Sequence, residues 1–307
     1  MFKRIIIGVE ERDGGRDAIE LAERAADRDA AMTLVNVCSN APTTWRGSSP
    51  IYEAVELQHA QDVLTGLRQT TGIDATLRPV AAATPGRGLH MVAEDENADL
   101  LVLGSSRRGL LGRVLLGDDT REALNGAPCP VMIAPAGYAR DARPIGRIGV
   151  GYNGSPESEH ALAFARGLAS ELGAQLSALE AVEIPTYAFT AAAVPFSVDF
   201  IDDMVDSALR RVSALPGVEP HASYGRPAEE LAHFSASLDL LVVGSRGYGP
   251  LGRLVHGSTT SILIGTACCP LLVLTRGATK SASDKDMAGS ASFQDQSAWV
   301  KSTLAPR

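Results

Sequence analysis

The feature that most narrows the fold of this chain is an internal duplication. Segment 98–117, ADLLVLGSSRRGLLGRVLLG, matches segment 238–257, LDLLVVGSRGYGPLGRLVHG, and segment 7–26 matches segment 148–169. The repeat period is about 140 residues, far longer than the unit of a solenoid. Each copy also has its own alternation of apolar strand patterns and amphipathic helix patterns. The sequence therefore predicts two copies of one α/β domain.

The order of elements within each copy predicts its fold class. The apolar run at residues 5–9, IIIGV, is typical of a buried parallel strand, and apolar residues recur at helical spacing from Arg16 onward. Alternating strands and helices predict an open parallel five-stranded sheet with helices on both faces, joined by right-handed crossovers. We expect domains over residues 1–137 and 144–276. Residues 277–307 are rich in Ser, Ala and Asp without periodicity, which predicts a disordered tail.

The second copy contains a glycine motif suited to a phosphate. The apolar run at residues 240–243 predicts a strand that leads into a loop with Gly244 and Gly247. Gly257 and Ser258 then open a helix. Glycines let main-chain N–H groups approach a phosphate closely, and a helix start adds N–H donors and the positive end of a dipole. A tight turn between strand and helix would account for one glycine pair, whereas the complete set favours a nucleotide phosphate.

These features together resemble the universal stress protein family over about residues 1–276. The shared features are the glycine motif, an acidic or amide residue after the first strand, a helix start rich in Gly and Ser, and a CPV segment before the fifth strand. The resemblance implies a Rossmann-like fold with strand order 3-2-1-4-5, which brings the ends of the first and fourth strands to one crevice. ATP-binding members carry glycine, two residues, glycine, nine residues, glycine, and then Ser or Thr. The second copy matches this pattern, so the resemblance implies that it binds ATP.

Further residues of the second copy are assigned to this site. The resemblance places the end of the second strand, Ala181–Val182, beside adenine. It places Asn153 where ATP-binding members carry Asp, and an amide gives a metal less charge, so binding with or without Mg²⁺ stays open. Ser155 has a simpler role as the N-cap of a helix that has Pro156 at its first position. Arg246 either pairs with a phosphate or is a solvated loop residue. The assigned ATP-binding residues are Asn153, Ser155, Val182, Gly244, Arg246, Gly247, Gly257, Ser258 and Thr259.

The first copy departs from the motif. Gly104 and Gly117 hold the first and third glycine positions, but Arg107 replaces the second glycine and Asp118 replaces the serine. A carboxylate repels a phosphate, and a side chain at position 107 hinders close approach of the backbone. We therefore expect this degenerate site, with Glu10 after its first strand, to bind ATP weakly or not at all unless neighbouring arginines compensate.

Composition and missing motifs exclude several classes of function. The net charge of −8 argues against broad binding of nucleic acid or anionic membranes. The N-terminus does not resemble a signal peptide and no apolar run reaches transmembrane length, so we expect a cytoplasmic protein. P-loop lysine, HEXXH and GxSxG patterns do not occur in the sequence. We expect no dedicated enzyme, and at most weak ATP hydrolysis.

The leading hypothesis is an ATP-binding regulator of a stress or growth-arrest response, in which nucleotide occupancy biases conformation or partner choice. The alternatives are a slow ATPase and a nucleotide-free interaction scaffold. The fifth strands, at 130–134 and 270–274, are sheet edges in this strand order. They can pair with each other within one chain, and the resulting pseudo-twofold unit is expected to form a homo-oligomer, a dimer of such units. The sequence does not identify the protein partner.

Overall fold

The computed structural model describes residues 1–10, 14–39, 50–105, 118–183, 198–245 and 257–275. The predicted tail at 277–307 lies outside these residues. The first half of the chain contains β1 (Phe2–Gly8), α1 (Gly14–Ala25), β2 (Ala26–Ser39), α2 (Pro50–Thr71), β3 (Thr76–Ala82), α3 (Pro85–Asp95), β4 (Leu100–Gly104), α4 (Asp118–Leu124) and β5 (Val131–Ala134), followed by a 3₁₀ turn, η1 (Tyr138–Arg140). The second half contains β6 (Arg147–Gly151), α5 (Pro156–Leu172), β7 (Gln175–Val182), α7 (Val198–Ser213), β8 (Glu219–Tyr224), α8 (Pro227–Ser235), β9 (Leu240–Gly244), α9 (Ser258–Thr266) and β10 (Leu271–Leu274).

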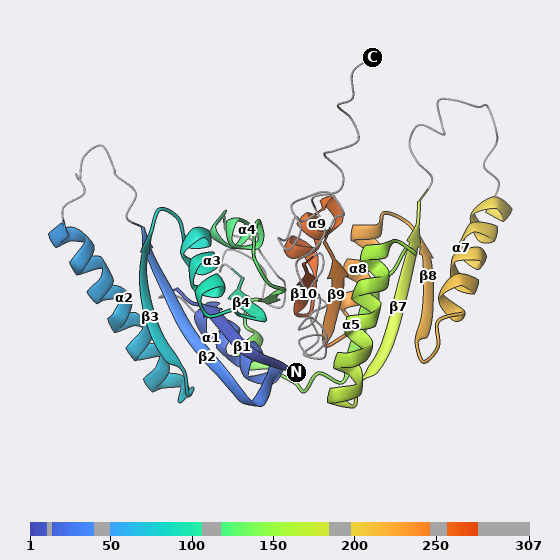
Figure 1. Ribbon diagram of the computed structural model, residues 1–307. Helices are drawn as coiled ribbons and strands as arrows, with labels where there is room; N and C mark the ends of the chain where they lie inside the picture. Colours follow the sequence, from blue (N-terminus) through green and yellow to red (C-terminus); the bar gives the residue numbers. More distant parts are fainter. Residues whose placement is uncertain (11–13, 40–49, 106–117, 184–197, 246–256, 276–307) are drawn as a thin grey trace, which may run out of the picture.

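The strands form one continuous ten-stranded sheet in the order β3-β2-β1-β4-β5-β10-β9-β6-β7-β8. Read inward from its outer edge, β3 or β8, each half has the order 3-2-1-4-5 that the sequence predicts. Pairing is parallel within each half and antiparallel between β5 and β10, where Met132 lies opposite Leu272. The expected pairing of the two fifth strands is therefore confirmed, and Figure 1 shows β10 at the centre of the molecule, on the side of the second half that faces the first.

Helices cover both faces of this sheet (Figure 1). One core contains apolar side chains of α1, α2, α5 and α7, and a second core contains those of α3, α4, α8 and α9. The central strands lie between the two cores, which explains why their sequences are continuously apolar. Among the helices that the structure describes, none combines the length and the apolar character needed to span a bilayer.

The strand register changes one of the sequence alignments. The pairing of β1 with β4 and of β6 with β9 equates Ile5, and not Ile7, with Ile148. The match of segment 7–26 was therefore displaced by two residues. In the corrected register Glu10 corresponds to Asn153, so the two halves differ by one charge at the end of their first strands.

A buried carboxylate fixes the start of the connection between the halves. Asp17 on α1 is 4% exposed and accepts hydrogen bonds from the N–H groups of Gly137 and Ala139, each at 2.8 Å. Burial raises the pKa of the Asp17 carboxyl, and the two N–H donors and Arg140 oppose this rise. The turn η1 is thereby held against α1 directly after β5.

The junction of the two halves is expected to depend on Met132, which is fully buried in β5. Replacing it in Met132→Ala removes core contacts and should lower the free energy of unfolding by about 2–5 kcal/mol. The matched variant Met91→Ala changes a side chain that is 46% exposed, and it should cost less than about 0.5 kcal/mol. Urea unfolding of both variants measures the difference, and equal losses would contradict a packed junction.

The anchor at Asp17 gives a second stability prediction. Asp17→Ala leaves two main-chain donors without their acceptor and should lower the free energy of unfolding by about 1–3 kcal/mol. Asp95→Ala removes a carboxylate that is 61% exposed and paired with Arg78 at 2.7 Å, and it should cost less than about 1 kcal/mol. The comparison uses thermal or urea unfolding. A loss at Asp17 no larger than that at Asp95 would show that the turn η1 needs no such anchor.

Candidate functional site

The second half has a cavity of about 370 Å³ at the carboxyl ends of β6, β7 and β9. The apolar part of its lining includes Leu179, Ala181, Leu231 and Val243. The polar part includes Asn153, Ser155, Ser158, Gly244, Ser245, Gly257, Thr259 and Thr260. A concave pocket that combines apolar side chains with several polar groups is the usual form of a small-molecule site.

The loop after β6 is held by local hydrogen bonds. The Asn153 Oδ1 atom accepts from the Ser155 N–H at 3.1 Å, and Gly154 has a φ of 72°. Ser155 caps α5, because its Oγ accepts from the Ser158 N–H at 3.3 Å and Pro156 takes the first helical position. The predicted N-cap role of Ser155 is confirmed. These bonds fix Asn153 and Ser155 at the cavity before any ligand arrives.

The first glycine of the motif has a packing requirement of its own. A Cβ atom at Gly244 would lie 2.6 Å from the main-chain oxygen of Glu157 in the first turn of α5. In the first half, a Cβ atom at Gly104 would collide with the main-chain oxygen of Gly14 at the start of α1. Both glycines therefore allow a helix start to approach the end of the fourth strand of its half, which forms one wall of the crevice.

The start of α9 forms the polar end of the cavity. Gly257 is buried in an extended conformation with φ −86° and ψ 174°, and its oxygen accepts from the Ser261 N–H at 2.9 Å. The N–H groups of the first helical turn have no acceptor within the helix, and the helix dipole is positive at this end. Since Thr259 and Thr260 line the cavity, this arrangement suits an anion.

The structure brings together most of the assigned residues of the second half. Asn153, Ser155, Gly244, Gly257 and Thr259 line the cavity. Val182 and Ser258 are not among the described lining residues, but each is adjacent in sequence to one that is, Ala181 and Thr259 respectively. Arg246 and Gly247 lie outside the described residues.

Sequence reasoning missed three further kinds of lining residue. Ser158 and Thr260 lie one turn into their helices, and Pro227 opens α8 as Pro85 opens α3. The recurrence of this proline in both copies was a usable signal. Tyr152 also lines the cavity and donates a hydrogen bond from its hydroxyl to Glu159, which raises the pKa of Tyr152 to about 12. The phenol therefore stays neutral at physiological pH.

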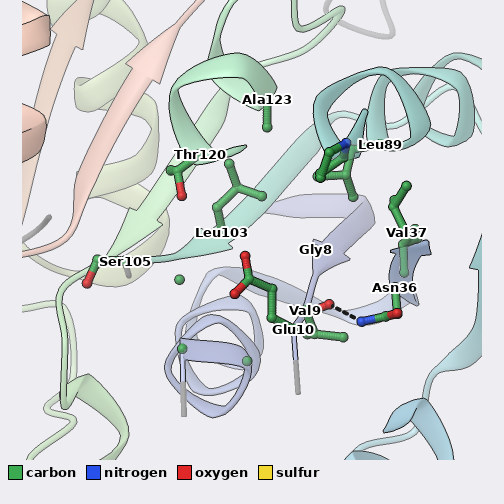
Figure 2. Close-up of a pocket in the computed structure, with 15 residues that line it drawn as sticks. Gly8, Val9, Glu10, Asn36, Val37, Leu89, Leu103, Ser105, Thr120 and Ala123 are labelled. Carbon is green, nitrogen blue, oxygen red and sulfur yellow. Dashed lines mark hydrogen bonds between the residues drawn. The ribbon is translucent and has the colours of Figure 1, made fainter. Parts of the chain in front are cut away.

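The first half has a cavity of about 200 Å³ in the corresponding place (Figure 2). Of the residues assigned to the degenerate site, Glu10 and Gly104 line it, Arg107 and Gly117 lie outside the described residues, and Asp118 begins α4. The Asn36 Nδ2 atom donates to the main-chain oxygen of Val9 at 2.8 Å. Figure 2 shows the Glu10 carboxylate directed toward Leu103. This cavity keeps the position of its counterpart but presents a carboxylate where the second half presents an amide.

Comparison with known proteins gives consistent matches along the chain. The family model described as the universal stress protein family matches residues 1–135 and again residues 144–275. A universal stress protein of Mycobacterium tuberculosis is 30% identical over 275 residues, which cover 82% of this chain and 90% of that relative. One from Mycolicibacterium smegmatis is 27% identical over 291 residues, covering 88% and 96%. The crystal structure of a universal stress protein from Archaeoglobus fulgidus has a TM-score of 0.61 and 18% identity, covering 89% of this chain and 98% of that chain. This chain therefore belongs to the universal stress protein family.

Proposed function

We propose that this protein is an ATP-binding regulator of a stress response, with its nucleotide site in the cavity of the second half. Membership of the universal stress protein family supports a stress-response role. The observation that carries the proposal of ATP is that one cavity is lined by apolar side chains, by the polar loop after β6 and by the start of α9. Adenine, ribose and phosphates need three surfaces of these kinds.

Each part of ATP has a matching surface. Leu179, Ala181 and Leu231 form an apolar slot for the base, and main-chain groups at the end of β7 border it. Asn153 offers an amide to a ribose hydroxyl. The start of α9 offers main-chain N–H groups and the positive end of the helix dipole to the phosphates.

The chemistry of the cavity favours binding over turnover. In the described part of its lining the titratable side chains are Tyr152 and Glu157, and Tyr152 is held neutral by its bond to Glu159. Mg²⁺ commonly takes one or two carboxylates together with phosphate oxygens, so Glu157 is compatible with Mg²⁺–ATP as well as with free ATP. We infer that a protein partner distinguishes the ATP-bound chain from the ATP-free chain, and that this difference is the regulatory signal.

Association between chains remains part of this proposal. The edges of the two fifth strands are used within the chain, because β5 pairs with β10. A homo-oligomer, the predicted dimer of pseudo-dimers, would therefore use a surface other than these two strands.

The proposed phosphate site can be tested by adding a negative charge at the start of α9. Gly257→Asp places a carboxylate beside the proposed phosphates, while Asp is also a favoured N-cap, so the helix should still form. ATP affinity should fall at least about tenfold, which corresponds to about 1.4 kcal/mol. Isothermal titration calorimetry measures the ATP affinity of both chains. Native mass spectrometry gives the stoichiometry, and we expect one ATP per wild-type chain.

The matched control is Gly167→Asp, which adds the same charge to the same half at an exposed helical position with open space around it. It should leave ATP affinity within about twofold of wild type. Equal losses in both variants would indicate a general charge effect. Absence of ATP binding by the folded wild-type chain would favour the nucleotide-free scaffold, and hydrolysis of bound ATP within minutes would favour the slow ATPase.

The amide at position 153 predicts how ATP affinity should depend on Mg²⁺ when this residue is changed to a carboxylate. Asn153→Asp keeps an oxygen acceptor for the Ser155 N–H but adds a negative charge beside ATP. The variant should bind free ATP about tenfold more weakly than wild type and recover most of that loss when Mg²⁺ is present. Calorimetry with and without Mg²⁺ measures both values, with the exposed Asn97→Asp as the control. If the loss of ATP affinity were the same with and without Mg²⁺, residue 153 would not interact with the metal.

A further inference from the structure

The helices α1 and α5 hold equivalent places in the two halves. Both contribute to the same core, and the main-chain oxygens of Gly14 and Glu157 lie against the fourth-strand glycine of their own halves in the same way. Three residues further along each helix, His160 of α5 takes the place of Asp17 of α1. His160 therefore stands where the first half has the anchor of its connecting turn, η1.

The imidazole of His160 has an unsatisfied nitrogen. Its Nε2 atom is buried and has no hydrogen-bond partner within the described part of the chain. A buried polar atom without a partner costs free energy. A neutral imidazole that carries its proton on Nδ1 can accept an N–H at Nε2, as the Asp17 carboxylate accepts two from the segment after β5. A main-chain donor that reaches this nitrogen would account for it.

The sequence after β10 repeats the glycine at which η1 begins. Ala134 and Leu274 are equivalent, because each pairs with the glycine that ends the fourth strand of its half. Gly137 follows Ala134 by three residues, and Gly277 follows Leu274 by three residues. Gly137 has a φ of 82°, a left-handed value that glycine adopts without steric cost. The chain beyond β10 can therefore make the turn that η1 makes beyond β5.

We propose that residues 276–280 form a turn that docks on α5, with His160 as its anchor. Gly277 takes the left-handed conformation of Gly137, and the His160 Nε2 atom accepts a main-chain N–H of the turn. The occupant is this segment because it begins at the site: Thr275, the last described residue, is 3% exposed. The second half then ends as the first does, and this docking does not depend on nucleotide binding.

Limited proteolysis of the native full chain measures the docking. Trypsin cleaves after Lys280, at the end of the proposed turn, and after Lys301, beyond it, and both bonds join a lysine to a serine. Cleavage of a docked segment requires that it first open, so cleavage after Lys280 should be at least about tenfold slower than after Lys301. Mass spectrometry follows both products, and the Lys301 bond is the internal reference.

Variants at His160 test the anchor. His160→Ala removes the acceptor, so cleavage after Lys280 should become at least about threefold faster while cleavage after Lys301 is unchanged. His160→Asp introduces the carboxylate that the first half uses, and it should keep or increase the protection. The control His233→Ala changes an exposed histidine of α8 and should leave both rates unchanged.

A variant within the tail tests the turn without altering α5. Gly277→Val disfavours the left-handed conformation and should speed cleavage after Lys280 as His160→Ala does. The control Gly289→Val changes a glycine beyond the turn and should have no effect. Circular dichroism checks that each variant is folded at the temperature of digestion.

Three results would overturn the proposal. The first is equally fast cleavage after Lys280 and Lys301 in the wild-type chain, which would leave His160 to water or to another chain. The second is wild-type protection in either His160→Ala or Gly277→Val. The third is a loss of protection in His160→Asp as complete as that in His160→Ala, because the carboxylate would then not replace the proposed acceptor.

Discussion

The antiparallel pairing of β5 with β10 is the interaction on which the rest of the architecture depends. Each half alone would end in an apolar fifth strand with an open edge, which invites pairing with other chains. Joining the two edges makes a ten-stranded sheet with Met132 and Leu272 fully buried at its centre. The sheet edges are now β3 and β8, which contain Pro79 and Pro220, and a proline cannot donate a main-chain hydrogen bond to a further strand.

Both cavities lie where the start of a helix approaches the end of the fourth strand of its half. Gly104 and Gly244 end the fourth strand of each half, and each faces the main-chain oxygen of a helix start without room for a Cβ atom. The glycine motif therefore serves two purposes in the second half, because its first glycine closes the crevice wall and its third begins α9. In the first half only the packing purpose is retained in full. This explains how a cavity can persist in a half whose glycine motif is incomplete.

The sequence predicted what depends on local pattern and on topology. The strand order was implied by the family resemblance, whereas the pairing of the fifth strands and the cap at Ser155 follow from edge exposure and cap chemistry. The alignment of β1 could not be fixed, because a shift of two residues keeps every side chain on the same face of a strand. The anchor at Asp17 could not be predicted either. It depends on contacts between segments distant in the chain, and no local pattern reports such burial.

The two halves show where a duplicated fold is free to diverge. Apolar strands, helix packing and the two close glycines are needed in both halves, because their loss would expose core surface or create a collision. The ends of the strands carry no such requirement. There Asn36 holds the Val9 carbonyl in the first half, whereas the corresponding residue of the second half, Glu180, is buried and paired with Arg211 at 2.6 Å. Polar and charged residues can therefore change near the ends of the strands while the strand order and pairing of the sheet stay the same.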